Sequence, residues 1–514
     1  MHLYQSKFNF LNRKYGLSGN TYLYLLVCLL LALVAKQSPL YSENQNTKFL
    51  HGMALAGVGH LESDWLAQTK DGLPMFSGLI YTIYAYSSPF VVYVLYVLLL
   101  GVFFFGLKGI LCTTFEIRLD SPKYILLCGA IVLIIARHHT FYDGFAVQYL
   151  FNGYLQPCVF GVFIILSIRW FLERQEALAS ACLALACLMH PAYLFVAALL
   201  IAILVVEVIF ERRGWRAMLS ILGPFTICAA CYLLYLSIEF RPTSAQCFDK
   251  AVQILAVERT PHHSLISYWA TPGMYAKLLL VLLSMFLLRG KRLFMIFSWL
   301  VLMTLMLTLL QIVTHSNALA VLAPWRASVV IMPLAVFSVI AWIIHRLPDK
   351  VGQALQARRR AVISVFALLF LILAVRGART NYKRFKKYHS GPEMSLLRHI
   401  ATHKRPSDIY LIPNHDDAFD KFRMETGAPA FVNWKSHPYK DVEVLEWYQR
   451  NRLVDQLYSA SVQELPGLLD ALRGRYRVTH LIASQRSGFE ACPLLKSEYY
   501  DSSFALYRIE PTIR

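Results

Sequence analysis

The chain has 514 residues, of which 57% are hydrophobic and 16% charged, with a net charge of +19. Soluble domains carry about a quarter charged residues, so this composition excludes an ordinary soluble protein and indicates one that uses lipid as solvent. The positive charge would suit nucleic acid, but the Lys and Arg residues gather in short loops beside apolar blocks. That bias is typical of cytoplasmic loops in membrane proteins, so we expect the lipid bilayer as a partner and no nucleic acid.

The N-terminal region carries Lys7, Arg13 and Lys14 ahead of the first apolar block. A cleaved signal peptide would end in small residues, whereas Thr21–Ala35 is followed directly by Lys36. We therefore expect this block to be retained as the first membrane span, with the N-terminus in the cytoplasm.

Further apolar blocks follow along the chain, and a helix needs about 20 residues to cross the hydrocarbon core. About eleven spans are predicted, at 21–36, 88–113, 122–136, 155–172, 177–189, 191–210, 217–238, 273–288, 293–313, 328–345 and 361–377. The long run around His190 and Pro191 is divided into two spans because proline breaks or kinks a helix. This division places the basic loops at 212–216, 289–292 and 358–360 in the cytoplasm, as the positive-inside rule predicts.

This topology defines two domains. Residues 1–377 form a transmembrane domain whose outward segments are 37–87, 137–154 and 239–272, and residues 378–514 form an extracytoplasmic domain. In that tail, strand-like runs at 408–413, 429–434, 478–483 and 503–509 alternate with helical patterns at 442–458 and 465–472. The fold class is therefore a polytopic α-helical membrane protein with a C-terminal soluble α/β domain. The basic stretch 376–387 falls outside in this topology and departs from the rule.

The first outward segment contains an acid-x-acid pair, Glu62 and Asp64. A carboxylate at this position is suited to act as a general base on an acceptor hydroxyl, or to hold a divalent ion beside a phosphate. The alternative is a solvated loop that happens to contain acids.

The second outward segment offers Arg137, His138, His139 and Asp143. Asp143 is the only acid in this segment, so it is the natural second carboxylate of the site. The two histidines are adjacent and no further ligand stands at metal spacing, which argues against zinc. They are better suited to bond a phosphate or sugar hydroxyls, or to lie at the membrane interface.

The third outward segment contributes His262 and His263, and a short loop before the span at 328–345 contributes Arg326. An arginine between two apolar runs is costly unless it is paired, which makes Arg326 a functional candidate. Its planar guanidinium suits two phosphate oxygens. The alternative is that its side chain reaches to the lipid headgroups.

Taken together, these features resemble the GT-C class of membrane glycosyltransferases, and within it an uncharacterised bacterial group. The segments that carry the narrower resemblance are Asp64-Trp65, Arg259-Thr-Pro-His-His263, Ala323-Pro-Trp-Arg326, Phe422-Arg423 and Phe431-Val-Asn-Trp-Lys-Ser-His-Pro438. The resemblance implies transfer of a sugar from a polyprenyl-phosphate carrier to a glycan, lipid or protein at the outer face of the membrane. The tail lacks the Trp-Trp-Asp triplet of oligosaccharyltransferases, which argues against transfer to asparagine sequons.

The resemblance also assigns roles to residues. Glu62 and Asp64 match the catalytic acid pair, with Asp64 the expected base for an inverting attack, and Asp143 matches a second-loop acid of some members. Arg326, Arg137 and His262 would neutralise the carrier phosphate. No cofactor is certain, and a divalent ion (Mg or Mn) at the three acids is the alternative.

Two other classes remain open from the sequence. An O-antigen-type polysaccharide polymerase or ligase would place its active Arg and His in a large outer loop, such as 239–272. A transporter or a membrane scaffold would be non-enzymatic. A transporter is expected to carry charged residues within its spans, and the predicted spans contain almost none. The chain has no Asn-x-Ser/Thr acceptor, which favours a bacterial plasma membrane with the tail in the periplasm.

Overall fold

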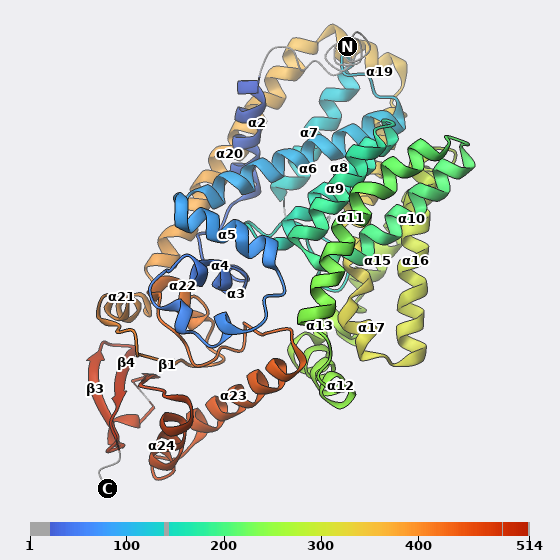
Figure 1. The fold of residues 1–514 in the computed structure, drawn as a ribbon. Helices are drawn as coiled ribbons and strands as arrows, with labels where there is room; N and C mark the ends of the chain where they lie inside the picture. Colours follow the sequence, from blue (N-terminus) through green and yellow to red (C-terminus); the bar gives the residue numbers. More distant parts are fainter. Residues whose placement is uncertain (1–20, 138–142, 486, 512–514) are drawn as a thin grey trace.

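The computed structural model describes residues 21–137, 143–485 and 487–511. A bundle of apolar helices makes up most of the molecule, and a smaller C-terminal part with a sheet lies at one end of it (Figure 1). The chain is embedded in a membrane, because helices of this length and composition need lipid around them.

Six helical segments in the described part of the chain are long and apolar enough to span a bilayer. Four of them are single helices: α6 (Val91–Phe115), α11 (Trp215–Glu239), α16 (Arg292–Thr314) and α20 (Arg359–His389). The segment Pro191–Phe210 consists of the turn η5 (Pro191–Tyr193) and α10 (Leu194–Phe210). The segment Asn317–His345 consists of α17 (Asn317–Leu322), the turn η7 (Pro324–Ala327) and α18 (Ser328–His345). Shorter apolar helices accompany them: α2 (Thr21–Ala35), α7 (Pro122–Arg137), α8 (Val162–Leu172, after η4, Pro157–Gly161), α9 (Glu176–Met189) and α15 (Pro272–Leu287).

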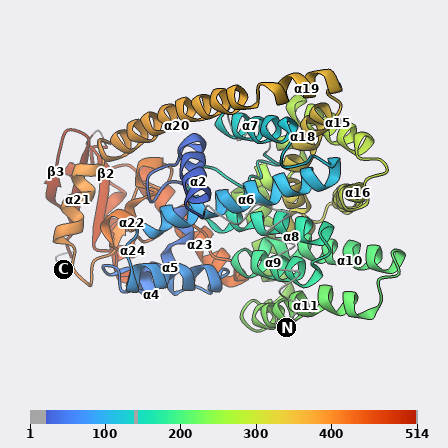
Figure 2. The same cartoon turned by 90° about the horizontal axis from the view of Figure 1, so that it is seen from above.

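The outer surfaces of the bundle have the character of lipid-facing surfaces. On α20, Leu368, Ile372 and Val375 are each more than half exposed, and only 11% of the apolar window of that helix is buried. Such a row of exposed aliphatic side chains would be unfavourable in water and is ordinary in hydrocarbon. Seen from above, α20 runs along one side of the bundle beside α2 and α7 (Figure 2).

The interruption predicted at His190 and Pro191 is confirmed. Helix α9 ends at Met189, His190 is extended, and η5 begins at Pro191. Proline has no N–H to donate and its ring crowds the preceding turn, so it commonly breaks or kinks a helix, and here the helix ends before it.

The segments between the spans form short helices at the end of the bundle that meets the tail. These are α3 (Gln45–Lys48), α4 (Leu50–Leu55), η1 (Leu61–Ser63), η2 (Leu66–Gln68), α5 (Pro74–Tyr86), α12 (Ala245–Gln253), η6 (Ile254–Arg259), α13 (Pro261–Ser264) and α14 (Ile266–Trp269). A further helix, α19 (Asp349–Ala357), lies at the opposite end (Figure 1).

The tail contains a four-stranded sheet of order β1-β2-β4-β3. Its elements are α21 (Met394–His403), β1 (Tyr410–Leu411), η8 (Asp417–Phe419), α22 (Phe422–Thr426), α23 (Asp441–Ser459), α24 (Leu465–Tyr476), β2 (His480–Ser484), η9 (Phe489–Ala491), β3 (Leu495–Tyr500) and β4 (Phe504–Ile509). Strand β1 pairs with β2 in parallel, with Leu411 opposite Leu481, whereas β4 is antiparallel to both its neighbours. The helices cover the faces of the sheet, as in other mixed α/β domains.

Several expectations for the tail are met and others are not. Helices α23 and α24 and strands β1, β2 and β4 are where the pattern predicts them. The run 429–434 forms only a single bridge, between Ala430 and Tyr410, and β3 was not predicted. The expected domain boundary at 377 lies inside α20, which continues as one helix to His389.

The tail contacts two of the predicted outward segments. In the first, the Lys70 N–H donates to the carboxylate of Glu443, and the third packs on the tail through α12. Helix α12 packs on α23, where Ala251, Leu255 and Val444 share a buried cluster. Nearby, the Thr243 backbone N–H and hydroxyl both donate to the carboxylate of Asp441, at 2.6 and 2.9 Å. The tail therefore shares an interface with the loops that hold Glu62, Asp64, His262 and His263.

Candidate functional site

Arg326 lies in η7, the turn that joins α17 to α18. The turn begins after Ala323, whose backbone is left-handed (φ +50°), and the Arg326 N–H donates to the Ala323 carbonyl at 2.8 Å. Helix α18 continues from Ser328, so Arg326 precedes the first turn of α18 and lies in a break of the apolar segment Asn317–His345. Arg326 is half-buried, in agreement with its apolar sequence neighbours.

The second outward segment is folded against this turn. The Phe145 N–H donates to the Ser328 hydroxyl at 2.8 Å, and the rings of Phe145 and Trp325 lie 4.8 Å apart. A Cβ on Gly144 would lie 2.2 Å from the Ser328 hydroxyl oxygen, so only glycine allows this approach. Asp143 lies two residues before Phe145, and Arg326 lies two residues before Ser328. The hydrogen bond between Phe145 and Ser328 therefore holds the two segments that carry them together.

The third outward segment reaches the same place. His263 Nδ1 is 2.7 Å from the Ala146 carbonyl, and its ring lies 4.1 Å from that of His262. Lys277, in the first turns of α15, donates to the Asp143 carbonyl at 2.9 Å. The structure thus brings together four of the sequence-predicted residues: Asp143, His262, His263 and Arg326.

Several polar groups around Arg326 are buried without a hydrogen-bond partner among the described residues. They are Arg326 Nε, Trp325 Nε1, Trp269 Nε1 and His190 Nδ1. The two tryptophans touch at a ring distance of 5.3 Å, and each is less than 8% exposed. Buried donors are nearly always satisfied in folded proteins, so several unsatisfied together indicate a place for an absent acceptor. We call Arg326, Trp325, Trp269, His190 and His263 the Arg326 cluster.

The electrostatics of this region favour an anion. Burial lowers the pKa of His263 to about 3, and the positive charges of Arg326 and Arg259 act in the same direction. Burial and Arg259 likewise lower the pKa of His262. Both imidazoles are therefore neutral at pH 7. An acceptor that enters here meets Arg326, with Lys277 and Arg259 nearby, and several neutral donors.

The tail supplies one side of the approach to the site. Arg259 donates to the Lys435 carbonyl at 2.7 Å, and Lys435 Nζ lies 3.0 Å from a carboxylate oxygen of Glu43. The next histidine along the tail, His437, is half-buried, and desolvation together with Arg259 and Lys48 lowers its pKa to about 3. Two of the short motifs noted in the sequence, around Arg259 and around Lys435, therefore meet in space.

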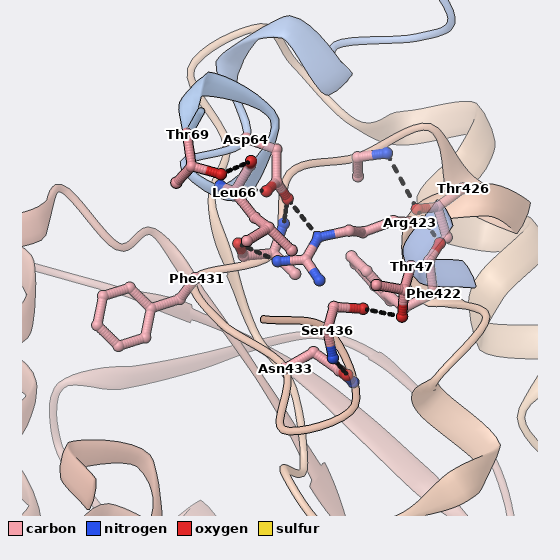
Figure 3. Close-up of polar contacts among 12 residues, drawn as sticks. Thr47, Asp64, Leu66, Thr69, Phe422, Arg423, Thr426, Phe431, Asn433 and Ser436 are labelled. Atoms are coloured by element: carbon pink, nitrogen blue, oxygen red, sulfur yellow. Dashed lines mark hydrogen bonds and ion pairs between the residues drawn. The ribbon is translucent and has the colours of Figure 1, made fainter. Parts of the chain in front are cut away.

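Asp64 is placed differently from the expectation. Its carboxylate is fully buried and accepts from Arg423 Nε at 2.5 Å, from the Ala430 N–H at 2.8 Å and from the Leu66 N–H at 2.9 Å (Figure 3). Arg423 also donates to the Ala430 carbonyl at 3.2 Å. Both carboxylate oxygens are engaged, so no face of Asp64 is open to a substrate. This placement argues against the expected role of Asp64 as general base and makes it a link between the first outward segment and the tail.

The remaining candidate residues lie apart from the Arg326 cluster or outside the residues that the structure describes. Glu62 is exposed and its carboxylate lies 3.9 Å from His60. Arg137 is the last residue of α7, and its side chain, like His138 and His139, lies outside the described residues. No group of three potential metal ligands occurs within the described ranges, and Asp64 is committed to Arg423 rather than to a shared site with Asp143.

Some residues of the site carried a weak sequence signal or none. Lys277 is a lone cation in a predicted span, which marks it as unusual. Arg423 belongs to the short motif Phe422-Arg423, but the sequence pattern did not indicate a role for it. The unsatisfied N–H groups of Trp269 and Trp325 depend on packing and have no sequence signal.

Comparison with known proteins adds one match. Residues 392–454 match a family model described as a domain of unknown function (DUF6798). The matched stretch runs from α21 into α23 and includes Arg423 and Lys435. No curated protein matches the chain.

Proposed function

We propose that the protein is a membrane glycosyltransferase of the GT-C type that uses a sugar linked to a polyprenyl-phosphate carrier. The observation that carries this proposal is the set of unsatisfied buried donors in the Arg326 cluster. A phosphate has several acceptor oxygens and a charge that Arg326 can match. A carrier lipid brings such a phosphate to headgroup depth, beside the ends of membrane helices.

The topology that fits this proposal has all eleven apolar helices in the bilayer and the tail outside the cytoplasm, at the plasma membrane of a bacterium. The Arg326 cluster then opens toward the outer face, on the same side as the tail. The acceptor is a glycan, lipid or protein that reaches this face.

In the proposed reaction, an acceptor hydroxyl oxygen bonds to the anomeric carbon of the sugar, while the bond from that carbon to the carrier phosphate oxygen breaks. Asp143 takes the hydroxyl proton, because it is the acid that lies beside the cluster. Arg326 and the tryptophan N–H groups stabilise the charge on the leaving phosphate. Asp64 and Arg423 act as positioning residues that hold the first outward segment against the tail.

The experiment uses full-length protein in detergent with a photo-crosslinking polyprenyl-phosphate probe. Arg326→Ala should reduce crosslinking about tenfold or more, because hydrogen bonds to a charged partner contribute about 1.5–3 kcal/mol. Asp143→Asn should leave crosslinking unchanged and lower cell-surface glycan by about 10²–10⁴-fold, as expected for a lost general base. Arg289→Ala, at the far end of α15, is the matched control for loss of one arginine.

Different outcomes separate the alternatives. Unchanged crosslinking in Arg326→Ala would remove the basis of the proposal. Normal glycan in Asp143→Asn, with loss in His262→Gln or Arg259→Ala, would favour a polymerase- or ligase-type reaction on the same carrier. Crosslinking without any change of glycan in all the variants would favour a transporter or scaffold.

A further inference from the structure

A second site lies in the bundle, away from the Arg326 cluster. A partly open pocket of about 830 Å³ is lined by α2, α6, α7, α8 and α20. Its lining residues on α20 run from Ile363 to Leu373, in the half of that helix nearer α19 and away from the tail (Figure 1). None of the residues of the Arg326 cluster lines it. Its volume is in the upper part of the range of about 300–1,000 Å³ that is usual for small-molecule sites.

The lining is mostly aliphatic and aromatic, with a few polar groups at one side. Lys108 donates to the Tyr124 hydroxyl at 2.8 Å, and in the described part of the chain no carboxylate lies within ion-pair distance of its ammonium. Arg169, in contrast, is paired with Glu173 at 2.9 Å, so these two charges cancel. The cavity therefore carries the charge of one lysine.

An ammonium among apolar side chains is unfavourable unless a counter-ion accompanies it. Helix α20 forms one wall, and its other side is the exposed aliphatic surface that faces lipid. The molecules that surround this wall are thus lipids, which supply both apolar chains and anionic headgroups.

From these observations we propose that the cavity binds an anionic glycerophospholipid. Its phosphate pairs with Lys108 and accepts from the Tyr124 hydroxyl, and an acyl chain lies along the apolar lining. Basic pockets between membrane helices are known to recognise lipid headgroups in this way. The site is independent of the proposed sugar transfer, because the Arg326 cluster lies elsewhere in the bundle.

The test uses the full-length protein in detergent and a phosphatidylglycerol that carries a photoactivatable group on its acyl chain. Label should be found on peptides of α6, α7 and α20, and unlabelled phosphatidylglycerol should compete better than phosphatidylcholine. Lys108→Gln should lower the labelling about tenfold, as expected for a lost charged hydrogen bond, whereas Lys108→Arg should keep most of it. Lys291→Gln is the matched control, because Lys291 is also a lysine near the end of a membrane helix and does not line the cavity.

A second variant tests the proposal independently, in case Lys108→Gln does not fold. Ala367→Trp enlarges an exposed lining residue on α20, so it should fill the cavity and reduce labelling while leaving Lys108 intact. Equal labelling of Lys108→Gln and the wild type would overturn the proposal, as would label spread evenly over all lipid-facing helices. Stronger competition by polyprenyl phosphate than by phosphatidylglycerol would also overturn it and would assign the cavity to the carrier.

Discussion

The carboxylate of Asp64 and the guanidinium of Arg423 form a buried ion pair between residues 359 positions apart in the chain. The aspartate comes from the first outward segment and the arginine from α22 of the tail. Their side chains are 0% and 4% exposed, so neither charge has water to replace its partner. Either charge can be buried at low cost only while the first outward segment and the tail keep this relative position.

Removing one partner of this pair should be strongly destabilising. Asp64→Ala leaves the Arg423 charge buried and should lower the free energy of unfolding by about 3–5 kcal/mol. The double variant Asp64→Leu with Arg423→Met should recover much of this loss, because two apolar side chains leave no unpaired charge. Thermal unfolding in detergent would measure each variant.

The same cycle separates a structural role from a catalytic one. For a positioning pair, Asp64→Ala and Arg423→Ala should lose glycan output together, and the double variant should regain part of it. Loss of output in every Asp64 variant, with full output in Arg423→Ala, would restore Asp64 as the base.

The contact between Gly59 and Gly427 beside this pair depends on the absence of a side chain. Gly59 has a φ of +59°, and a Cβ there would lie 2.3 Å from the Gly427 carbonyl oxygen. Gly59→Ala should therefore lower stability by about 2–5 kcal/mol, from backbone strain and steric overlap together. Gly57→Ala is the control, since its φ is +70° but nothing lies within 4 Å, and it should show only the backbone strain of about 1–2 kcal/mol. Equal losses in chemical denaturation would contradict the proposed close contact.

The unsatisfied indole groups predict an unusual combination of effects. Trp269→Phe keeps an aromatic ring but removes a buried donor that has no partner among the described residues, so the stability of the free protein should change by less than about 1 kcal/mol. Binding of the polyprenyl-phosphate probe should nevertheless weaken, by roughly tenfold, through loss of a hydrogen bond to a charged acceptor. Thermal unfolding and crosslinking on the same preparation would measure both.

Trp447→Phe provides the opposite control. Its indole donates to the Asn433 carbonyl at 3.1 Å within the tail, so its replacement should lower stability by about 1 kcal/mol and leave probe binding unchanged. A loss of stability without a loss of binding in Trp269→Phe would show that its N–H serves packing only.

The half-buried histidines His263 and His437 predict the direction in which stability changes with pH. The folded-state pKa of His263 and of His437 is about 3, below the unfolded value of about 6.5. Below pH 6.5 the unfolded chain binds protons that the folded chain does not, so stability is lost as the pH falls from about 6.5 toward 3. His437→Gln should flatten the fall of the melting temperature over this range, and an unchanged slope would contradict the burial of a neutral imidazole at this position.

The apolar pattern of the sequence was sufficient for the membrane class and for many helix positions. Runs of aliphatic residues without charges have few alternatives to helices in lipid, because every backbone group must be bonded within the chain. Pro191 marked a helix end for an equally local reason, since its nitrogen carries no hydrogen. Strand β3 escaped prediction because it is an edge strand whose Lys496, Ser497 and Glu498 are all exposed, so it lacks an alternating pattern.

The sequence also marked Asp143, His262, His263 and Arg326 as candidates by chemistry and by their outward position, and the fold brings them together. It could not show that Asp64 is closed off by Arg423, that two indole N–H groups near Arg326 lack partners among the described residues, or that Lys108 borders a pocket. Helix formation depends on neighbours a few residues away, which a sequence displays directly. Whether a charge is buried, paired or left facing a cavity depends on residues hundreds of positions apart, and only the tertiary packing brings these into contact.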